Sequence, residues 1–386
     1  MGFDAAEWLN LAIRWLHLTA GIAWIGSSFY FVWLDNHLTR PAGGDASGEL
    51  WSVHGGGFYH NQKYQVAPSA MPERLHWFKW EAYFTWISGF SLLVLVYYVG
   101  AQSILIDPAK VPLGPGAAIA IGLAALALGW LVYDGLCRSP LRSSDLALGI
   151  FWFGCLLFAA ALLDSLFNSR AAYLHVGAIV GTVMVANVFL IIIPNQRKVV
   201  ADLIAGRTPD PRLGAQAKQR SLHNNYMTLP VLFIMISPHY PMTYGAGRPW
   251  LVLALLGLTG VAVRHIFNLR GRGQRTGPTI ALAAALAVVT VTYVTMEKKG
   301  DAPGQAGKPT YAAIEPILAA HCSACHNLNP PPLGVALDNW EHVSAASARI
   351  KRVAVDSQVM PLGNPTGMTP AERQKLGAWI AAGSPK

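Results

Sequence analysis

Apolar residues run in long stretches through residues 1–296, and charged and turn-forming residues separate one stretch from the next. A helix needs about 20 mostly apolar residues to cross the hydrocarbon core of a bilayer. The stretch at 145–164 is short, and the one at 221–238 opens with the polar Asn224 and Asn225. We predict eight membrane-spanning helices, at residues 8–34, 77–100, 116–137, 145–164, 173–193, 221–238, 249–268 and 277–296.

The composition agrees with this pattern. Hydrophobic residues make up 53% of the chain and charged residues only 13%, whereas soluble domains carry about 25% charged residues. A water-soluble protein of several ordinary domains is therefore excluded, and the lipid bilayer is the expected surrounding of residues 1–296.

The position of the cations predicts how the helices are oriented. The formal net charge is +9, and fourteen Lys and Arg residues lie in one alternating set of loops against three in the other set. The positive-inside rule places the richer set in the cytoplasm and both ends of residues 1–296 outside. The basic charge is therefore a topology signal, and we expect no nucleic-acid partner. The richer loops are 35–76, 138–144, 194–220 and 269–276.

Residues 297–308 are polar and contain Gly, Pro and Lys, a composition typical of a flexible linker. Residues 309–386 then form a small soluble domain on the outer face. The expected fold class is all-α, with an eight-span helical bundle followed by a small helical domain.

The outer domain contains one C-x-x-C-H sequence, formed by Cys322, Cys325 and His326. This spacing is the attachment site of c-type haem, in which two thiols bond the porphyrin and the histidine binds iron. A chance pair or a thiol redox pair is the alternative. Haem c is attached on the outer side of the bacterial inner membrane, where the cation count independently places this domain. We predict a cytochrome c domain.

The iron of such a domain needs a second axial ligand, and a methionine thioether suits a cytochrome of positive potential. Met360 and Met368 are the candidates. Met368 directly precedes Thr369, which together with Glu372 predicts a capping box at the start of the last helix. We therefore predict that His326 and Met360 hold the iron.

Ionisable side chains inside membrane spans are costly and point to function. By the predicted orientation His17 and His175 lie toward the outer leaflet, and His223 and His265 lie toward the cytoplasm. Histidines that face each other across a bundle can bind an intramembrane haem b. His17 and His175 are the candidate ligands, and an ordinary interfacial histidine is the alternative for each.

The same histidines suggest a weak internal repeat. His17 follows Trp15-Leu16 and His175 follows Tyr173-Leu174, each at the start of a predicted span. His76 and His223 also follow an arginine and open the next spans. A duplication of a four-span unit would explain both pairs, and coincidence is the alternative.

Arg264 lies next to His265 within the seventh predicted span. An arginine in a bundle core needs an anionic partner, which could be a carboxylate such as Glu81, a haem propionate or a substrate. Together with His223, Asn224 and Asn225, Arg264 predicts a pocket facing the cytoplasm that suits a small, flat, polar anion.

Four segments carry a resemblance to a known family, and they lie at residues 17–26, 76–81, 187–197 and 223–230. Together with the C-x-x-C-H domain, they resemble the bacterial membrane-bound urate oxidase (urate hydroxylase) family. Members of that family join an eight-span domain to a C-terminal cytochrome c. The resemblance covers essentially the whole chain, and the haem-attachment motif shows no departure.

The resemblance implies an oxidoreductase that converts urate to 5-hydroxyisourate without hydrogen peroxide. It implies a bacterial inner-membrane protein with its cytochrome domain in the periplasm. Electrons would pass to the haem c and on to an external cytochrome c or a terminal oxidase. On this hypothesis Arg264, His223 and Asn224 hold urate, and His223 or His265 accepts a proton.

Three other functions stay open. The chain could be a different cytochrome-linked dehydrogenase, such as a quinol oxidase. It could be a non-catalytic electron-transfer subunit of a larger complex. It could also be a transporter, although transport alone has no use for a haem. The residues by themselves do not choose the substrate.

Overall fold

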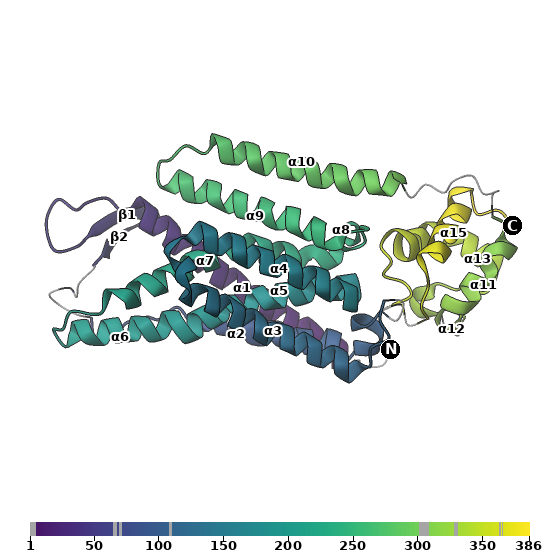
Figure 1. Ribbon diagram of the computed structural model, residues 1–386, viewed down its shortest axis with the longest axis horizontal. Helices are drawn as coiled ribbons and strands as arrows, with labels where there is room; N and C mark the ends of the chain where they lie inside the picture. The colour runs from purple at the N-terminus through teal and green to yellow at the C-terminus, as the bar shows by residue number, and fades with distance from the viewer. Residues whose placement is uncertain are drawn as a thin grey trace.

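The computed structural model describes residues 5–64, 68, 72–107, 110–300, 309–327, 331–362, 364 and 366–386. It consists mostly of helices, which form a long bundle with a smaller helical domain at one end (Figure 1). The bundle contains α1 (Ala5–His37), α2 (Trp80–Leu92), α3 (Pro115–Arg138), α4 (Asp145–Leu166), α5 (Ser169–Ala186), α6 (Ile193–Ile204), α7 (Pro211–Ile236), α8 (Pro241–Tyr244), α9 (Pro249–Gly271) and α10 (Gly277–Gly300).

Helices occur at all eight predicted positions, and five helices are long and apolar enough to cross a membrane. These five are α3, α4, the continuous helix over 169–204, α9 and the part of α10 up to Met296. The remaining three predicted spans fall on α1, α2 and α7. Polar side chains such as His17 interrupt the apolar surface of α1, and the first half of α7 is polar. The described part of the chain is compatible with a membrane protein, and membrane crossing by α1, α2 and α7 stays a prediction.

The long fifth helix contains a wider π-helical turn at Asn187–Ile192 between α5 and α6. α2 likewise continues as a π-helical segment, Leu93–Tyr98. π-helical turns displace side chains from the regular helical positions and are frequent at functional sites. Asn187 is the first residue of its turn and is completely buried.

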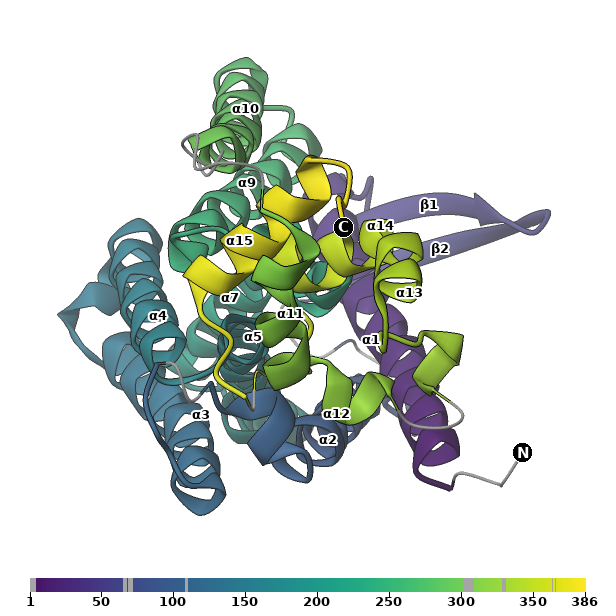
Figure 2. The same ribbon diagram turned by 90° about the vertical axis from the view of Figure 1, so that its right-hand side faces the viewer.

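A two-stranded antiparallel hairpin in the first long loop departs from the all-α expectation. β1 (Gly48–His54) pairs with β2 (Gly57–Lys63), and the hairpin projects from the side of the bundle (Figure 2). Gly55 and Gly56 form its turn with φ of 58° and 80°. A two-residue hairpin turn of this kind needs positive φ at both positions, and glycine adopts it without steric cost.

The core of the bundle lies around α5. Eleven of its residues are buried, including Tyr173, His175 and Val183. α10 lies at the periphery of the bundle beside α9 (Figures 1 and 2). The polar residues that concern function therefore depend mainly on α3, α5, α7 and α9.

The C-terminal domain has its own apolar core, to which Ile314, Leu318, Val343 and Trp379 belong. The predicted capping box at the start of its last helix is confirmed, because Thr369 and Glu372 bond each other's backbone N–H groups. The domain contacts the bundle where the Asn364 amide donates to Asp107 at 3.3 Å. Its helices are α11 (Tyr311–His321), α12 (Ser323–His326), α13 (Trp340–Ala345), α14 (Ser347–Ile350) and α15 (Pro370–Ala381).

The predicted linker at 297–308 lies largely outside the described residues. α10 continues as a helix to Gly300, and the predicted domain boundaries stay a prediction. Residues 301–308 are not described.

Candidate functional site

The predicted catalytic residues belong to two separate polar networks, and each network includes residues of α7. His223 and Asn224 lie in a network with α3 and α5, whereas Arg264 and His265 lie in a network with α7 residues Asn225 and Tyr226. Asn224 and Asn225 are consecutive, and consecutive helical side chains differ in direction by about 100°. This rotation sends the two amides to different neighbouring helices.

The first network is built around Arg220, whose side chain is only 6% exposed. Its guanidinium donates to Asp134 at 2.6 Å and to the side-chain oxygen Oδ1 of Asn187 at 3.1 Å. It also lies over the Tyr133 ring, 5.0 Å from the ring centre. The charge of this buried arginine is therefore compensated by a carboxylate, as a stable buried cation requires.

The same network continues to His223 through a chain of hydrogen bonds. The Asn187 amide donates to the Asn224 oxygen at 2.9 Å and to the Tyr133 hydroxyl at 3.2 Å. The Tyr133 hydroxyl lies 2.9 Å from His223 Nδ1, and His223 Nε2 lies 3.4 Å from Asp145. Almost every polar atom here has a partner, so this network stabilises the arrangement of α3, α5 and α7.

The second network differs because its arginine has no acidic partner. Arg264 donates from Nε to the Asn225 oxygen at 2.8 Å, and its guanidinium lies 4.0 Å from the centre of the Phe29 ring. No carboxylate lies within 4.0 Å of it in the part of the chain that the structure describes. Arg264 is nevertheless only 6% exposed.

Two buried amide atoms beside Arg264 also have no partner among the described residues. Asn268 Nδ2 donates to the Asn225 oxygen at 3.1 Å, which leaves Asn268 Oδ1 and Asn225 Nδ2 unsatisfied. A buried polar atom without a hydrogen bond is costly, and each such atom in a native structure needs an explanation. A guanidinium, an unused N–H donor and an unused acceptor together are suited to a planar anion that also carries N–H groups.

A tyrosine–histidine pair joins the same two helices, one residue further along each helix than Asn225 and Arg264. Tyr226 follows Asn225 on α7, His265 follows Arg264 on α9, and the Tyr226 hydroxyl lies 2.7 Å from His265 Nδ1. His265 is half-buried. The hydrogen bond fixes the orientation of the imidazole and leaves Nε2 as its second nitrogen.

The sequence indicated part of these networks and missed the rest. It singled out His223, Asn224, Asn225, Arg264 and His265, but it gave no site role to four residues on which their environment depends. The spacing of Arg264 and Asn268, like that of Arg220 and Asn224, places both on one helix face. That spacing was the available signal. The four missed residues are Tyr133, Asn187, Arg220 and Asn268.

The two candidate haem b ligands, His17 and His175, lie at different contacts between helices. His17 Nδ1 contacts the Thr85 carbonyl oxygen of α2 at 2.9 Å. His175 is fully buried, with Nδ1 bonded to the Ala171 carbonyl at 2.8 Å and Nε2 3.3 Å from the Tyr98 hydroxyl. A Cβ added at Gly122 would lie 2.8 Å from this Nε2, so α3 closes the space in front of it. A metal on His175 Nε2 would have to displace the Tyr98 hydroxyl and α3, and a haem b at His17 and His175 stays a prediction.

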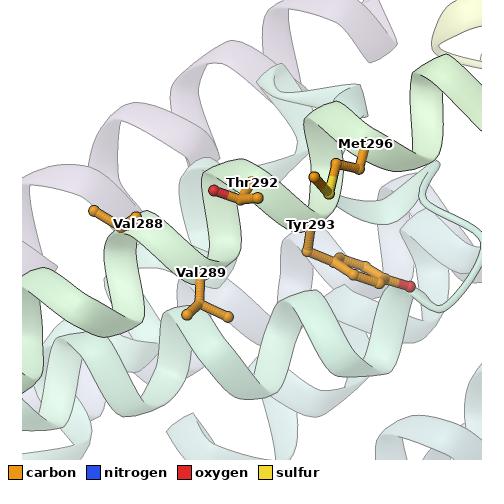
Figure 3. A pocket seen from close by; sticks show the side chains of 5 residues that line it. All are labelled: Val288, Val289, Thr292, Tyr293 and Met296. Carbon is orange, nitrogen blue, oxygen red and sulfur yellow. The ribbon is translucent and has the colours of Figure 1, made fainter.

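An apolar groove on α10 offers no comparable chemistry. Figure 3 shows the five side chains that line it, all from α10, and none of them carries a cation or an amide. A surface of this kind suits lipid chains. The lining residues are Val288, Val289, Thr292, Tyr293 and Met296.

The C-x-x-C-H residues lie at the junction of α11 and α12. Cys322 is half-buried against the core of the C-terminal domain and Cys325 is exposed. Burial raises the pKa of the Cys322 thiol to about 11. His326 Nδ1 lies 2.8 Å from the Val335 carbonyl oxygen. Histidines that bind metals commonly make such a bond, because it orients the ring and leaves Nε2 free.

The two methionine candidates differ in burial. Met360 is half-buried and packs on the same core as Cys322, whereas Met368 is 1% exposed within that core. The Met360 backbone is fixed from both sides, because its N–H donates to the Val353 carbonyl and its own carbonyl accepts from Arg373. Cys322, Cys325 and His326 lie together at one helix junction, and Met360 as the second ligand of a haem iron stays a prediction. Among the described residues no group of three or more His, Cys, Asp and Glu side chains could hold a bare metal ion.

Fold and site together define a helical protein with spans suited to a membrane, a buried polar cluster with an uncompensated cation, and a separate domain that carries C-x-x-C-H. A family model described as urate oxidase N-terminal matches residues 4–296. Because this match covers more than half of the chain, the protein belongs to the urate oxidase N-terminal family. No curated protein and no solved structure shows a significant match. The family indicates an oxidoreductase function related to urate.

Proposed function

We propose that this protein oxidises urate to 5-hydroxyisourate in its helical bundle and passes the electrons to a haem c on its C-terminal domain. Family membership supports urate as the substrate. The C-x-x-C-H residues support an electron acceptor attached to the chain itself. The cluster formed by Arg264, Asn225 and Asn268 is the proposed substrate site.

The observation that carries this assignment is the unused hydrogen-bonding capacity of the buried cluster. Urate at neutral pH is a planar monoanion with carbonyl oxygens and ring N–H groups. Arg264 supplies positive charge and N–H donors to its oxygens, as a guanidinium does for other planar anions. Asn225 Nδ2 donates to a further acceptor, and Asn268 Oδ1 accepts from a ring N–H.

The reaction balances without dioxygen. Urate monoanion and one water give 5-hydroxyisourate, two electrons and one proton, and the new oxygen at C5 comes from water. His265 accepts the proton at Nε2 while Tyr226 holds the ring from Nδ1. Arg264 stabilises the anion until its charge leaves with the electrons.

The C-terminal domain receives the electrons. His326 Nε2 and the Met360 sulfur would hold the iron, and Cys322 and Cys325 would bond the porphyrin. A bound haem c supplies a one-electron acceptor, so two electrons leave urate one at a time. An external cytochrome c or a terminal oxidase in the periplasm then takes them. No step depends on a haem b at His17 and His175.

Anaerobic addition of urate to the purified protein tests the proposal. The haem c absorption band should become reduced, with two haems reduced per urate consumed. Reaction in isotopically labelled water should place the label in the product. The Cys325→Ala variant should bind urate but not turn it over. Steady-state urate consumption by that variant at the wild-type rate would reject the role of the haem, and quinol oxidation without activity on purines would reject urate as substrate.

A further inference from the structure

A cavity of about 510 Å³ lies between the turn that joins α3 to α4 and the first half of α7. This part of α7 adjoins α6 at the end of the bundle opposite the C-terminal domain (Figure 1). The loops of that end carry most of the cations of residues 1–296. None of the residues of the proposed substrate site lines the cavity.

The lining contains more positive charge than its neighbours compensate. Asp134 serves two of the arginines, since it accepts from Arg138 and Arg220, each at 2.6 Å. The other two, Arg142 and Arg212, have no carboxylate within 4.0 Å in the described ranges of the chain. The arginines that line the cavity are Arg138, Arg142, Arg212 and Arg220.

Hydrogen bonds hold the wall of the cavity in place. Gln219 on α7 donates to the Arg142 carbonyl oxygen at 2.9 Å and to Asp145 at 2.7 Å. This ties the turn after α3 to α7. Arg220 is buried and is fixed by Asp134 and Asn187. Arg220 is therefore fixed at the cavity wall, whereas Arg142 and Arg212 line the cavity with exposed side chains that a bound anion would order.

We propose that this cavity binds a phosphate group. A tetrahedral phosphate presents oxygens in several directions, so guanidinium groups from different segments can donate to it at once. Arg142 and Arg212 supply the charge that Asp134 does not neutralise. An anionic phospholipid and free inorganic phosphate share this chemistry. Basic pockets between helices on the cytoplasmic side of a membrane commonly bind lipid phosphates. The site is independent of the proposed urate chemistry.

The test uses the full-length protein in phosphatidylcholine nanodiscs, with and without phosphatidylglycerol, and with inorganic phosphate added separately. The melting temperature and the number of retained phosphatidylglycerol molecules, counted by native mass spectrometry, are the two readouts. The variant carries Arg142→Gln and Arg212→Gln together. Both side chains are exposed and make no ion pair in the described structure, so their loss spares the fold. The control carries Arg272→Gln and Arg275→Gln, which remove equal charge from a loop of the same set outside the cavity.

Wild-type and control proteins should gain thermal stability with the phosphate ligand, and the cavity variant should bind it roughly tenfold or more weakly, because two charge-assisted hydrogen bonds are lost. A response to phosphatidylglycerol alone identifies the lipid as the source, and a response to inorganic phosphate identifies the free anion. Equal losses in the cavity variant and the control would overturn the proposal, because the effect would then be one of net charge. The absence of any response in wild type would overturn it as well.

Discussion

Two buried arginines on neighbouring helices differ in whether a carboxylate compensates their charge. Arg220 on α7 is bonded to Asp134 and Asn187, and its network uses nearly all of its donors and acceptors. Arg264 on α9 has a similar degree of burial, but among the described residues its guanidinium bonds Asn225 and lies over the Phe29 ring, with no carboxylate within 4.0 Å and two unsatisfied amide atoms beside it. Burial alone therefore does not mark a functional arginine. The missing counter-charge does, because only an uncompensated cation leaves its attraction available to a ligand.

The largest effect should come from removing the compensated arginine. Arg220→Gln removes the buried partner of Asp134 and leaves this half-buried carboxylate only its exposed partner Arg138 among the described residues, and breaking a buried ion pair from one side costs up to about 3–5 kcal/mol. The melting temperature in detergent should fall sharply. Arg138→Gln removes the exposed partner of the same carboxylate and should cost at most about 1 kcal/mol. Equal melting temperatures for the two variants would show that the comparison is wrong.

Arg264→Gln should weaken urate binding and leave the stability of the fold nearly unchanged. No carboxylate in the described structure loses its partner, so the melting temperature should change little. Urate affinity should fall by roughly a hundredfold, because charge-assisted hydrogen bonds in a buried site are lost. Titration calorimetry measures the affinity, and Arg270→Gln on the exposed face of α9 is the matched control. If Arg264→Gln bound urate with the wild-type affinity, Arg264 would not belong to the substrate site.

The two consecutive asparagines sharpen the comparison further. Asn224→Leu should lower the free energy of unfolding by about 1–3 kcal/mol and spare urate affinity, because both of its hydrogen bonds are structural. Asn225→Leu removes the acceptor of Arg264 and a donor that is unsatisfied in the described structure, and should weaken urate binding by about tenfold. Parallel denaturation and urate titration separate the two outcomes. Similar urate affinities for both variants would contradict the division into two networks.

Tyr226→Phe tests the role given to His265. Loss of one hydrogen bond to the ring should reduce kcat by about threefold to tenfold and leave KM unchanged, since Tyr226 positions the histidine and does not bind urate. The pH profile of kcat should also shift. Tyr240→Phe, at an exposed tyrosine, is the control. An unchanged kcat and pH profile would remove His265 and Tyr226 from the proposal.

The smallest predicted effect on stability concerns the C-terminal domain, far from Arg220 and Arg264. Hydrogen bonds from the Thr369 backbone and hydroxyl lower the pKa of Glu372 to about 2. A carboxylate whose folded pKa is lowered stabilises the fold above its unfolded pKa, which is about 4.3, and loses this stabilisation as the pH falls toward 2. The protection of amides at the start of α15 against hydrogen exchange, measured relative to their intrinsic exchange rate, should therefore decrease over this range. Glu372→Gln should remove the pH dependence, and Glu315→Gln should keep it.

Features written in adjacent residues could be predicted from the sequence. The helices follow from uninterrupted apolar stretches, and the capping box follows from Thr369 and Glu372 three residues apart. The C-x-x-C-H motif is equally local. The hairpin at Gly48–Lys63 was not predicted, because a two-stranded ribbon without a core carries little hydrophobic periodicity.

The candidate site could be predicted only in part. The sequence showed that a cation such as Arg264 is energetically costly in an apolar helix. It could not show whether the carboxylate of another helix lies close enough to compensate the charge. It grouped both Asn224 and Asn225 with Arg264, whereas the structure bonds Asn225 to Arg264 and Asn224 to Asn187.

The sequence by itself thus determined the helices, the distribution of cations between their ends and the attachment motif, because each depends on residues close together in the chain. Only the tertiary structure decided which arginine is compensated, since Asp134 and Arg220 are distant in sequence and meet through the packing of α3 against α7. A rotation of about 100° between consecutive helical residues then separates a structural amide from one that faces the proposed ligand.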